Sequence, residues 1–202
     1  MIYLFGTGKR YKIVKDLLSQ NKVKIKTIAI DEKKYNYSKK IFDVKYFLKN
    51  YNRKNDFLII SISDPIKKFE IFNRLRLKKK IKLFPPLISL SATIKKKVKI
   101  GNGSIIMDRA YIGENVKIKE NCSIGVSTLI SHDSKINSCS EVSHKSKIAG
   151  NVNIGKKCFL GLGSIVTQNL KLSDGCFVGA GVLIKKNQPK NTRITLKQNL
   201  DY

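Results

Sequence analysis

Seventeen aliphatic residues recur at every sixth position of this chain, from Ile88 to Ile184, without a gap. The position two residues before each of them is small or β-branched from Ala92 onward, with Leu170 as the large exception. Residues two apart in a strand point to the same face, so both positions of each hexad point inward. A period of six therefore indicates short strands joined by turns, as in a parallel β-helix. The aliphatic positions are Ile88, Ile94, Ile100, Ile106, Ile112, Ile118, Ile124, Ile130, Ile136, Val142, Ile148, Ile154, Leu160, Val166, Leu172, Val178 and Ile184.

Glycine often follows the inward aliphatic residue, and we interpret this as a turn that needs unusual backbone dihedrals. The pattern gives a little over five triangular coils, whose strands would stack about 4.8 Å apart. Three cysteines share the small inward position and lie one above another, and we interpret them as small core residues. The glycines are Gly101, Gly113, Gly125, Gly155, Gly161 and Gly179, and the cysteines are Cys122, Cys158 and Cys176.

The first 84 residues follow a different pattern, in which strands and helices alternate. Apolar runs predict strands at 2–8, 24–31 and 57–63, and helical spacing predicts helices at 10–20 and 64–77. This order is typical of a small α/β unit with a parallel sheet. We therefore expect a Rossmann-like domain at 1–84, a β-helix domain at 85–186 after Pro85-Pro86, and a C-terminal tail at 187–202.

The chain is strongly basic, with 41 Lys and Arg against 14 Asp and Glu and a net charge of +27. Only six of the basic residues are Arg, and the lysines are spread along the whole chain, which does not favour nucleic-acid binding. No apolar run reaches the roughly 20 residues of a membrane span, so we expect a cytoplasmic protein. The four cysteines lack CxxC spacing, and no metal site is indicated.

Both histidines, His132 and His144, occupy outward positions near a corner of the predicted coil. His132 is followed by Asp133, whose carboxylate could orient the imidazole and stabilise its protonated form. Eighteen residues on, directly above His132 on the next coil, Gly150 leaves room for a ligand. His144 has Ser143 and Lys145 as neighbours and lies below a leucine, so we select His132 as the candidate base.

A single histidine without a nucleophilic partner suits acyl transfer from a thioester. Such a base removes a proton from an amine or hydroxyl, which then attacks the thioester carbonyl directly. A backbone amide from a glycine turn could stabilise the developing oxyanion. The two histidines and the aspartate lie on different sides and do not converge on a metal.

The sequence resembles the hexapeptide acetyltransferases of the NeuD and PglD type. The resemblance covers nearly the whole chain and rests on GTGKRYKIVKDLL at 6–18, IISISDPIKKFEIFNRL at 59–75, ISHDSKI at 130–136 and AGNVNIGKKCFLGLGSIVTQNLKL at 149–172. It implies a left-handed parallel β-helix, a homotrimer with active sites between subunits, acetyl-CoA as co-substrate, and a nucleotide-linked amino sugar as acceptor.

The resemblance also implies roles for single residues. His132 matches the catalytic base and Asp133 its acidic neighbour. Four positions match the acetyl-CoA groove: Gly150, Leu162, Gly163 and Ala180. Seven match the nucleotide-sugar site: Gly6, Thr7, Gly8, Arg10, Asp31, Ser61 and Ser63.

Three departures from the family pattern leave alternatives open. Lys9 and Arg10 replace a family Gly-His pair, although both cations could meet a diphosphate. Glu141 stands where relatives often have a second histidine, and the glycine-proline segment near the C-terminus is missing. N-acetylation of an amino-dideoxy sugar is the leading hypothesis. The alternatives are O-acetylation of a sugar hydroxyl, as with sialic acid, and a trimeric sugar-binding scaffold whose active site has decayed.

Overall fold

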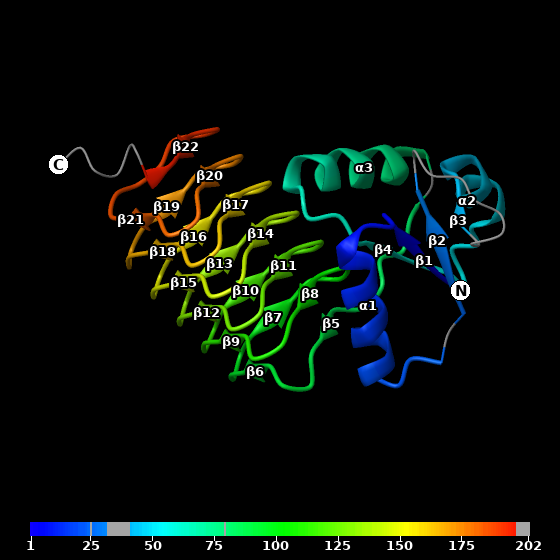
Figure 1. Ribbon diagram of the computed structural model, residues 1–202, viewed down its shortest axis with the longest axis horizontal. Coiled ribbons are helices and arrows are strands. Elements are labelled where there is room, and N and C mark those ends of the chain that lie inside the picture. Colours follow the sequence, from blue (N-terminus) through cyan, green and yellow to red (C-terminus); the bar gives the residue numbers. More distant parts are fainter. Residues whose placement is uncertain (25, 32–40, 79, 197–202) are drawn as a thin grey trace.

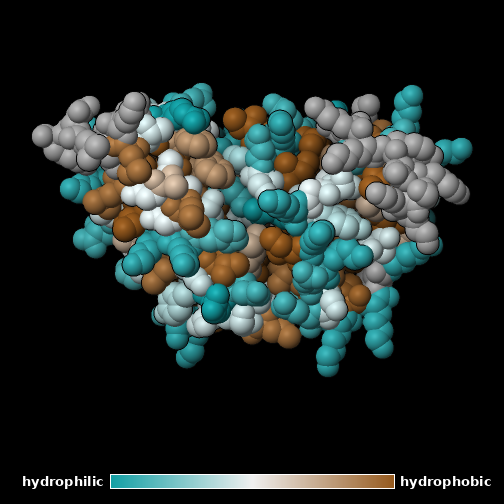
Figure 2. Space-filling view, in the orientation of Figure 1, coloured by the Kyte–Doolittle hydropathy of each residue, from teal (hydrophilic) through white to brown (hydrophobic). Residues whose placement is uncertain are grey.

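The computed structural model describes the chain except for residues 25, 32–40, 79 and 197–202. It contains an N-terminal α/β part at one end of a long parallel β-solenoid, and the last described strand, β22 (Arg193–Ile194), lies at the opposite end of that solenoid (Figure 1). Among the described residues, no helix has both the length and the apolar character to cross a membrane. Hydrophilic side chains cover much of the face in Figure 2, with smaller hydrophobic patches between them.

The α/β part is a four-stranded parallel sheet with helices, and the strand order is β3-β2-β1-β4. The predicted helices at 10–20 and 64–77 and the predicted strands at 2–8, 24–31 and 57–63 are all present, although the three strands are shorter and residue 25 lies outside the described residues. Neither β3 nor α2 was predicted. The N-cap of α2 is Asp43, whose carboxylate accepts a hydrogen bond from the Tyr46 amide. The elements are β1 Ile2–Phe5, α1 Lys9–Gln20, β2 Thr27–Ile30, β3 Ile41–Phe42, α2 Val44–Asn50, β4 Phe57–Ile60 and α3 Pro65–Lys78.

The solenoid consists of two-residue parallel strands in three sheets, as the hexad period predicted. In each strand the second residue is the inward aliphatic one. From Ile106 to Ile184 these side chains are almost completely buried, whereas Ile94 and Ile100, near the N-terminal end, are only half-buried. The first residue of each strand points outward, and it gives each sheet its own surface chemistry.

We name one sheet by the part that packs on it and the other two by their outward residues. The docked sheet carries the α/β part and contains β5 Leu87–Ile88, β8 Ile105–Ile106, β11 Ser123–Ile124, β14 Glu141–Val142, β17 Phe159–Leu160, β20 Phe177–Val178 and β22 Arg193–Ile194. The apolar sheet contains β6 Thr93–Ile94, β9 Tyr111–Ile112, β12 Leu129–Ile130, β15 Lys147–Ile148, β18 Ile165–Val166 and β21 Leu183–Ile184. The lysine sheet contains β7 Lys99–Ile100, β10 Lys117–Ile118, β13 Lys135–Ile136, β16 Asn153–Ile154 and β19 Lys171–Leu172.

The α/β part packs on the outer face of the docked sheet. Leu87 and Ile105 share a buried cluster with β1, α1 and β4. Strand β22, from the segment expected as a tail, pairs with β20 and so extends the docked sheet to Ile194. The packing leaves the apolar and lysine sheets outside this contact.

The glycines that follow the inward aliphatic residues stand where the sequence predicted turns, but their φ values are not positive. The predicted reason was wrong, because the requirement is close approach to the next coil. A Cβ on Gly113 would lie 2.8 Å from the backbone nitrogen of His132. Positive φ falls elsewhere in the turns, for example at Asp133 (58°).

All four cysteines are buried free thiols, which agrees with the interpretation of Cys122, Cys158 and Cys176 as core residues. Burial raises the pKa of Cys122 and of Cys139 to about 12. A thiol that stays protonated at neutral pH is a poor nucleophile, so neither of these two is suited to carry an acyl group.

Candidate active site

His132 lies in the turn between β12 and β13, at the corner where the apolar and lysine sheets meet. Its backbone oxygen accepts a hydrogen bond from the Asn151 amide of the next coil at 3.0 Å, so the solenoid ladder fixes the turn. Its side chain is 64% exposed. The ring is thus held at its base and open to solvent at its tip.

Asp133 orients the imidazole. Its Oδ2 lies 2.8 Å from His132 Nδ1, and its Oδ1 accepts a hydrogen bond from Asn115 Nδ2 at 2.7 Å. The bond from Asn115, followed by the contact with His132, lowers the pKa of the Asp133 carboxyl below its usual range. An ionised carboxylate holds the proton on Nδ1, which leaves the lone pair on Nε2 free to accept a proton.

Gly150 lies above His132 on the next coil, as the spacing of eighteen residues predicted, but the space expected for a ligand is occupied by the imidazole ring itself. A Cβ built on Gly150 would lie 2.6 Å from both Cε1 and Nε2 of His132. Below the ring, Gly113 allows the backbone of the His132 turn to approach closely. Two glycines on neighbouring coils therefore set the height of the imidazole.

Replacing Gly150 by alanine is expected to displace the ring without unfolding the protein. The new methyl group would collide with the end of a flexible side chain rather than with backbone, so His132 must rotate. A misplacement of about 1 Å can lower turnover about 10²-fold. Steady-state kinetics together with a thermal melt test this prediction. An unchanged kcat would show that turnover does not depend on the ring position set by Gly150.

A cavity of about 440 Å³ lies beside His132 on the side of the preceding coils. Lys95 and Lys96 bring positive charge to it, and Tyr111 contributes an aromatic wall. The remaining lining residues are Gly113, Glu114, Ser131 and His132. An open base next to a cationic, partly aromatic cavity suits an anionic acyl donor or acceptor.

His144 is held in a different way. Its Nδ1 accepts a hydrogen bond from the Val126 amide at 2.8 Å, and the side chain is half-buried at the corner between the docked and apolar sheets. This nitrogen is occupied by the backbone, which gives His144 a structural role. The choice of His132 as the candidate base agrees with this geometry.

The four expected acetyl-CoA residues fall at two different corners. Gly150 shares the corner of His132, whereas Leu162, Gly163 and Ala180 lie at the corner of His144. The whole width of the apolar sheet separates the two corners. Leu162 is exposed, and nothing described lies within 4 Å of the position a Cβ would take on Gly163. A single chain therefore does not bring these groups together with His132.

The seven expected nucleotide-sugar residues do come together. They line one cavity of about 340 Å³ at the carboxyl ends of β1, β2 and β4. Asp31 Oδ2 accepts from the Thr7 amide at 3.2 Å and from the Thr7 hydroxyl, and Ser61 Oγ donates to the Gly6 carbonyl at 2.7 Å. Phe5, Lys9 and Ile62 complete this glycine-rich pocket.

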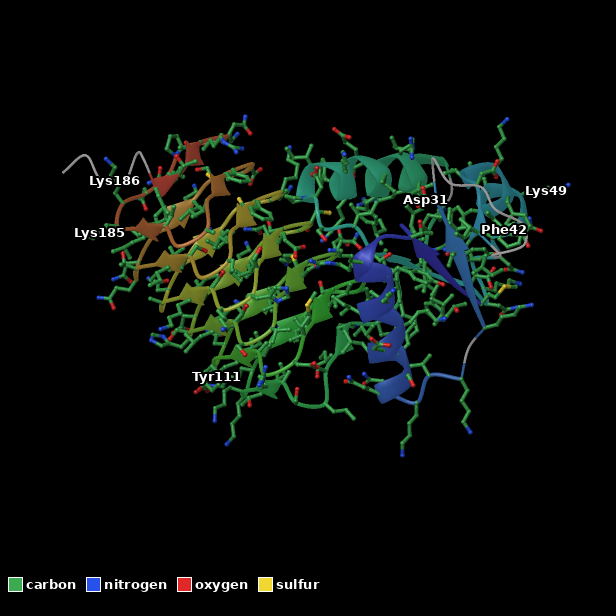
Figure 3. The ribbon with its side chains drawn as sticks, viewed as in Figure 1. Asp31, Phe42, Lys49, Tyr111, Lys185 and Lys186 are labelled. Carbon is green, nitrogen blue, oxygen red and sulfur yellow. The ribbon has the colours of Figure 1, made fainter. Side chains whose placement is uncertain are left out.

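The glycine-rich pocket and the His132 cavity are distant within one chain. Figure 3 shows Asp31, from the first, and Tyr111, from the second, in well-separated parts of the molecule. The glycine-rich pocket opens on the α/β part, which covers the docked sheet. The His132 cavity opens at the edge of the apolar sheet that lies away from the docked sheet. A reaction that uses both needs a second copy of the chain.

The solenoid also matches a known family. Residues 88–195, more than half of the chain, match the family model described as GMPPB C-terminal domain. The chain belongs to this family. The match to the GMPPB C-terminal domain family begins at the first solenoid strand and leaves the α/β part outside.

Solved structures extend the likeness over the α/β part as well. The acetyltransferase domain of PglB from Neisseria gonorrhoeae FA1090 is 19% identical, with a TM-score of 0.85 over 95% of this chain and 94% of that one. PerB from Caulobacter crescentus, solved with CoA and GDP-perosamine, is 20% identical, with a TM-score of 0.84 over 95% and 92%. WeeI from Acinetobacter baumannii AYE is 18% identical, with a TM-score of 0.72 over 91% and 95%. At these identities the comparison shows a shared fold.

A cluster of charged side chains joins the α/β part to the solenoid, and its contacts were not predicted from the sequence. Arg10 was expected to meet substrate, but its Nη1 lies 3.1 Å from Glu141 Oε2 and its Nη2 lies 2.5 Å from Oε1. Lys68, which the sequence did not single out, donates to Glu141 Oε2 at 3.2 Å and to Ser123 Oγ at 2.8 Å. Glu141 thus ties α1 and α3 to the docked sheet, on which it lies in β14, away from the corner of His132. Arg10 Nε is buried with no hydrogen-bond partner.

Asn115, Tyr111 and Lys95 were also missed as site residues. The signal existed in the period of eighteen, since Asn115 stands one coil below Asp133, but it required knowing that the two side chains bond across coils. Among the described residues no group of three or more His, Cys, Asp or Glu is placed to hold a metal ion.

Proposed function

We propose that the protein is an acetyl-CoA-dependent N-acetyltransferase that acts on the amino group of a nucleotide-linked amino-dideoxy sugar. The observation that carries the proposal is the His132–Asp133–Asn115 chain of hydrogen bonds, which leaves Nε2 of an exposed imidazole free beside a cavity. That arrangement suits a general base for an acceptor that arrives from solution.

The chemistry needs only one base and direct attack. His132 Nε2 takes a proton as the acceptor nitrogen bonds to the thioester carbonyl carbon. The tetrahedral intermediate then collapses, the carbon–sulfur bond breaks, and the imidazolium returns the proton to the leaving thiolate. Asp133 stabilises the imidazolium in between. The buried cysteines favour this route over an acyl-enzyme.

The substrate class is supported by the glycine-rich pocket. It opens at the amino end of α1, where backbone N–H groups and the helix dipole favour phosphate oxygens, and Lys9 adds a cation. The PerB structure was solved with CoA and GDP-perosamine, and the PglB domain was also solved with acetyl coenzyme A. Both acetyl-CoA and nucleotide sugars are cytoplasmic metabolites, so the proposal places the reaction in the cytoplasm.

The proposed assembly is a homotrimer. Each subunit has a Rossmann-like domain at 1–84, a left-handed β-helix domain at 85–186 and a tail at 187–202. Tyr111, Leu129 and Ile165 give the apolar sheet exposed large side chains in one register. Packing this face around a threefold axis would bring the His132 corner of one subunit beside the Leu162 corner of the next. Acetyl-CoA would lie in that groove, opposite the neighbour's glycine-rich pocket.

The test is thiol release from acetyl-CoA against a panel of nucleotide-linked 3-amino and 4-amino sugars, with the matching hydroxyl sugars and free sialic acid as controls. Turnover restricted to an amino sugar is the expected result. Turnover with a hydroxyl acceptor alone would assign O-acetylation, and silence across the panel would refute the proposal.

A further inference from the structure

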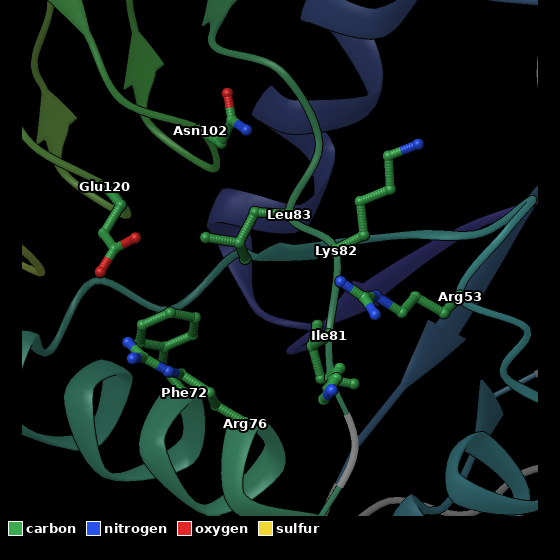
Figure 4. A pocket seen from close by; sticks show the side chains of 9 residues that line it. Arg53, Phe72, Arg76, Ile81, Lys82, Leu83, Asn102 and Glu120 are labelled. Atoms are coloured by element: carbon green, nitrogen blue, oxygen red, sulfur yellow. The ribbon is translucent and has the colours of Figure 1, made fainter.

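A third, larger cavity of about 670 Å³ lies at the junction of the α/β part and the solenoid (Figure 4). Three parts of the molecule contribute to it. Arg53, Phe72 and Arg76 come from the α/β part, the connecting segment 80–83 forms another side, and Asn102 and Glu120 come from the corner between the lysine and docked sheets.

The connecting segment is held rigidly at the base of this junction cavity. Lys82 donates its backbone N–H to the Tyr51 hydroxyl at 2.7 Å and accepts from the Leu58 amide at 2.9 Å. The Phe84 carbonyl accepts from the Gly103 amide of the solenoid at 2.6 Å. Phe72 of α3 and Leu83 of the segment itself are buried and provide an apolar surface. The cavity is therefore preformed.

The charge of the junction cavity is unbalanced. Four cations, Arg53, Arg76, Lys80 and Lys82, surround it, and Glu120 is the single carboxylate among its lining residues. Within the described chain, the side chains of Arg53, Arg76 and Lys80 have no hydrogen-bond or ion-pair partner. Lys82 Nζ lies 4.4 Å from the centre of the Phe57 ring. Like charges gathered around a preformed cavity favour an anionic occupant.

Neither the helix dipole of α3 nor the generally basic surface of the protein accounts for this cluster of cations. The C-terminal end of α3 stabilises nearby cations through the helix dipole, but that applies to Arg76 and Lys80, not to Arg53 or Lys82. The solvated surface of this protein is built from lysine, yet two of its six arginines line this one cavity. Arginine presents a planar fork that matches phosphate oxygens in pairs.

The junction cavity is separate from the proposed reaction site. It lies beside Arg53, which precedes β4, whereas the glycine-rich pocket lies at the carboxyl ends of the strands. Its solenoid residues stand at the corner between the lysine and docked sheets, not at the corner of His132. An occupant would therefore contact both parts of the chain without blocking the base.

We propose that the junction cavity binds a phosphate-bearing ligand that carries at least two negative charges. The arginine forks hold its phosphate oxygens, and its non-phosphate part packs against Phe72, Ile81 and Leu83. The shared chemistry is a phosphate ester, which a free nucleotide or an anionic lipid headgroup could supply. This assignment does not depend on the acetyltransferase proposal.

Calorimetric titration of the full chain with pyrophosphate and with ADP tests the assignment, and sedimentation with phosphatidic acid vesicles tests the lipid source. Arg53→Gln/Arg76→Gln is expected to lower affinity about tenfold or more. Arg53→Lys/Arg76→Lys should also weaken binding, because it keeps the charge and removes the fork. Lys24→Gln/Lys186→Gln removes the same charge from two exposed lysines that line none of the described cavities, and should bind within about twofold of the wild type.

Hydrogen exchange of the backbone amides shows independently where the ligand binds. Saturating pyrophosphate should slow exchange in segment 80–84 in the wild type and not in Arg53→Gln/Arg76→Gln. Equal loss of affinity in the pocket variant and the lysine control would reduce the effect to general electrostatics and overturn the assignment. Absence of binding for all three probes, or protection confined to the glycine-rich pocket, would overturn it too.

Discussion

Replacing His132 by alanine is expected to lower kcat for acetyl transfer by about 10²–10⁴-fold, the range typical of a lost general base. The fold should not change, because the side chain is 64% exposed and the turn is held by backbone hydrogen bonds. Thiol release at saturating acetyl-CoA measures the loss, and a thermal melt checks the fold.

His144→Ala is the matched control for this prediction. It removes the other histidine of the chain and a hydrogen bond from the Val126 amide, so it should lower stability while kcat stays within a few fold. Equal loss of turnover in both variants would point to a shared structural effect. Full activity of His132→Ala would exclude it as the base.

Introducing Asp at Leu129 and Ile165 together is expected to convert the assembly into monomers and abolish turnover. Both side chains stand outward on the apolar sheet, and burying two carboxylates in an interface without partners costs several kcal/mol. Light scattering after size exclusion gives the mass, and thiol release gives the activity.

Lys99→Asp is the control for the interface prediction. It places a carboxylate at the equivalent outward position of the lysine sheet, which stays solvated in the proposed trimer. Its mass and turnover should match those of the wild type. A trimeric Leu129→Asp/Ile165→Asp variant would show that subunits meet through another face.

The sequence predicted the solenoid well because its signal is periodic. Each inward aliphatic residue repeats the same physical requirement, and the strand register follows from the spacing of eighteen alone. The packing of the α/β part on the solenoid was harder to predict from the sequence. It depends on outward residues such as Leu87 and Ile105, and the hexad pattern does not constrain the residue type at outward positions.

The candidate site was predictable where the repeat of the coils decides the geometry and unpredictable where the α/β part meets the solenoid. His132, Asp133 and Gly150 follow from position on the coil. The engagement of Arg10 by Glu141 joins residues 131 apart in the chain, and only the packing of α1 on the docked sheet reveals it. The unexpected partner Lys68 lies on α3 for the same reason.

A subunit-mixing experiment tests the central claim, a site that takes His132 from one subunit and the glycine-rich pocket from its neighbour. His132→Ala and Asp31→Ala are each expected to be nearly inactive, the second because the Thr7 loop loses its carboxylate anchor. Unfolded together in equal amounts and refolded, they should recover about a quarter of wild-type turnover, because about one interface in four pairs two intact halves. Mixed oligomers that form, as seen by mass spectrometry of differently tagged subunits, yet stay inactive would contradict the account.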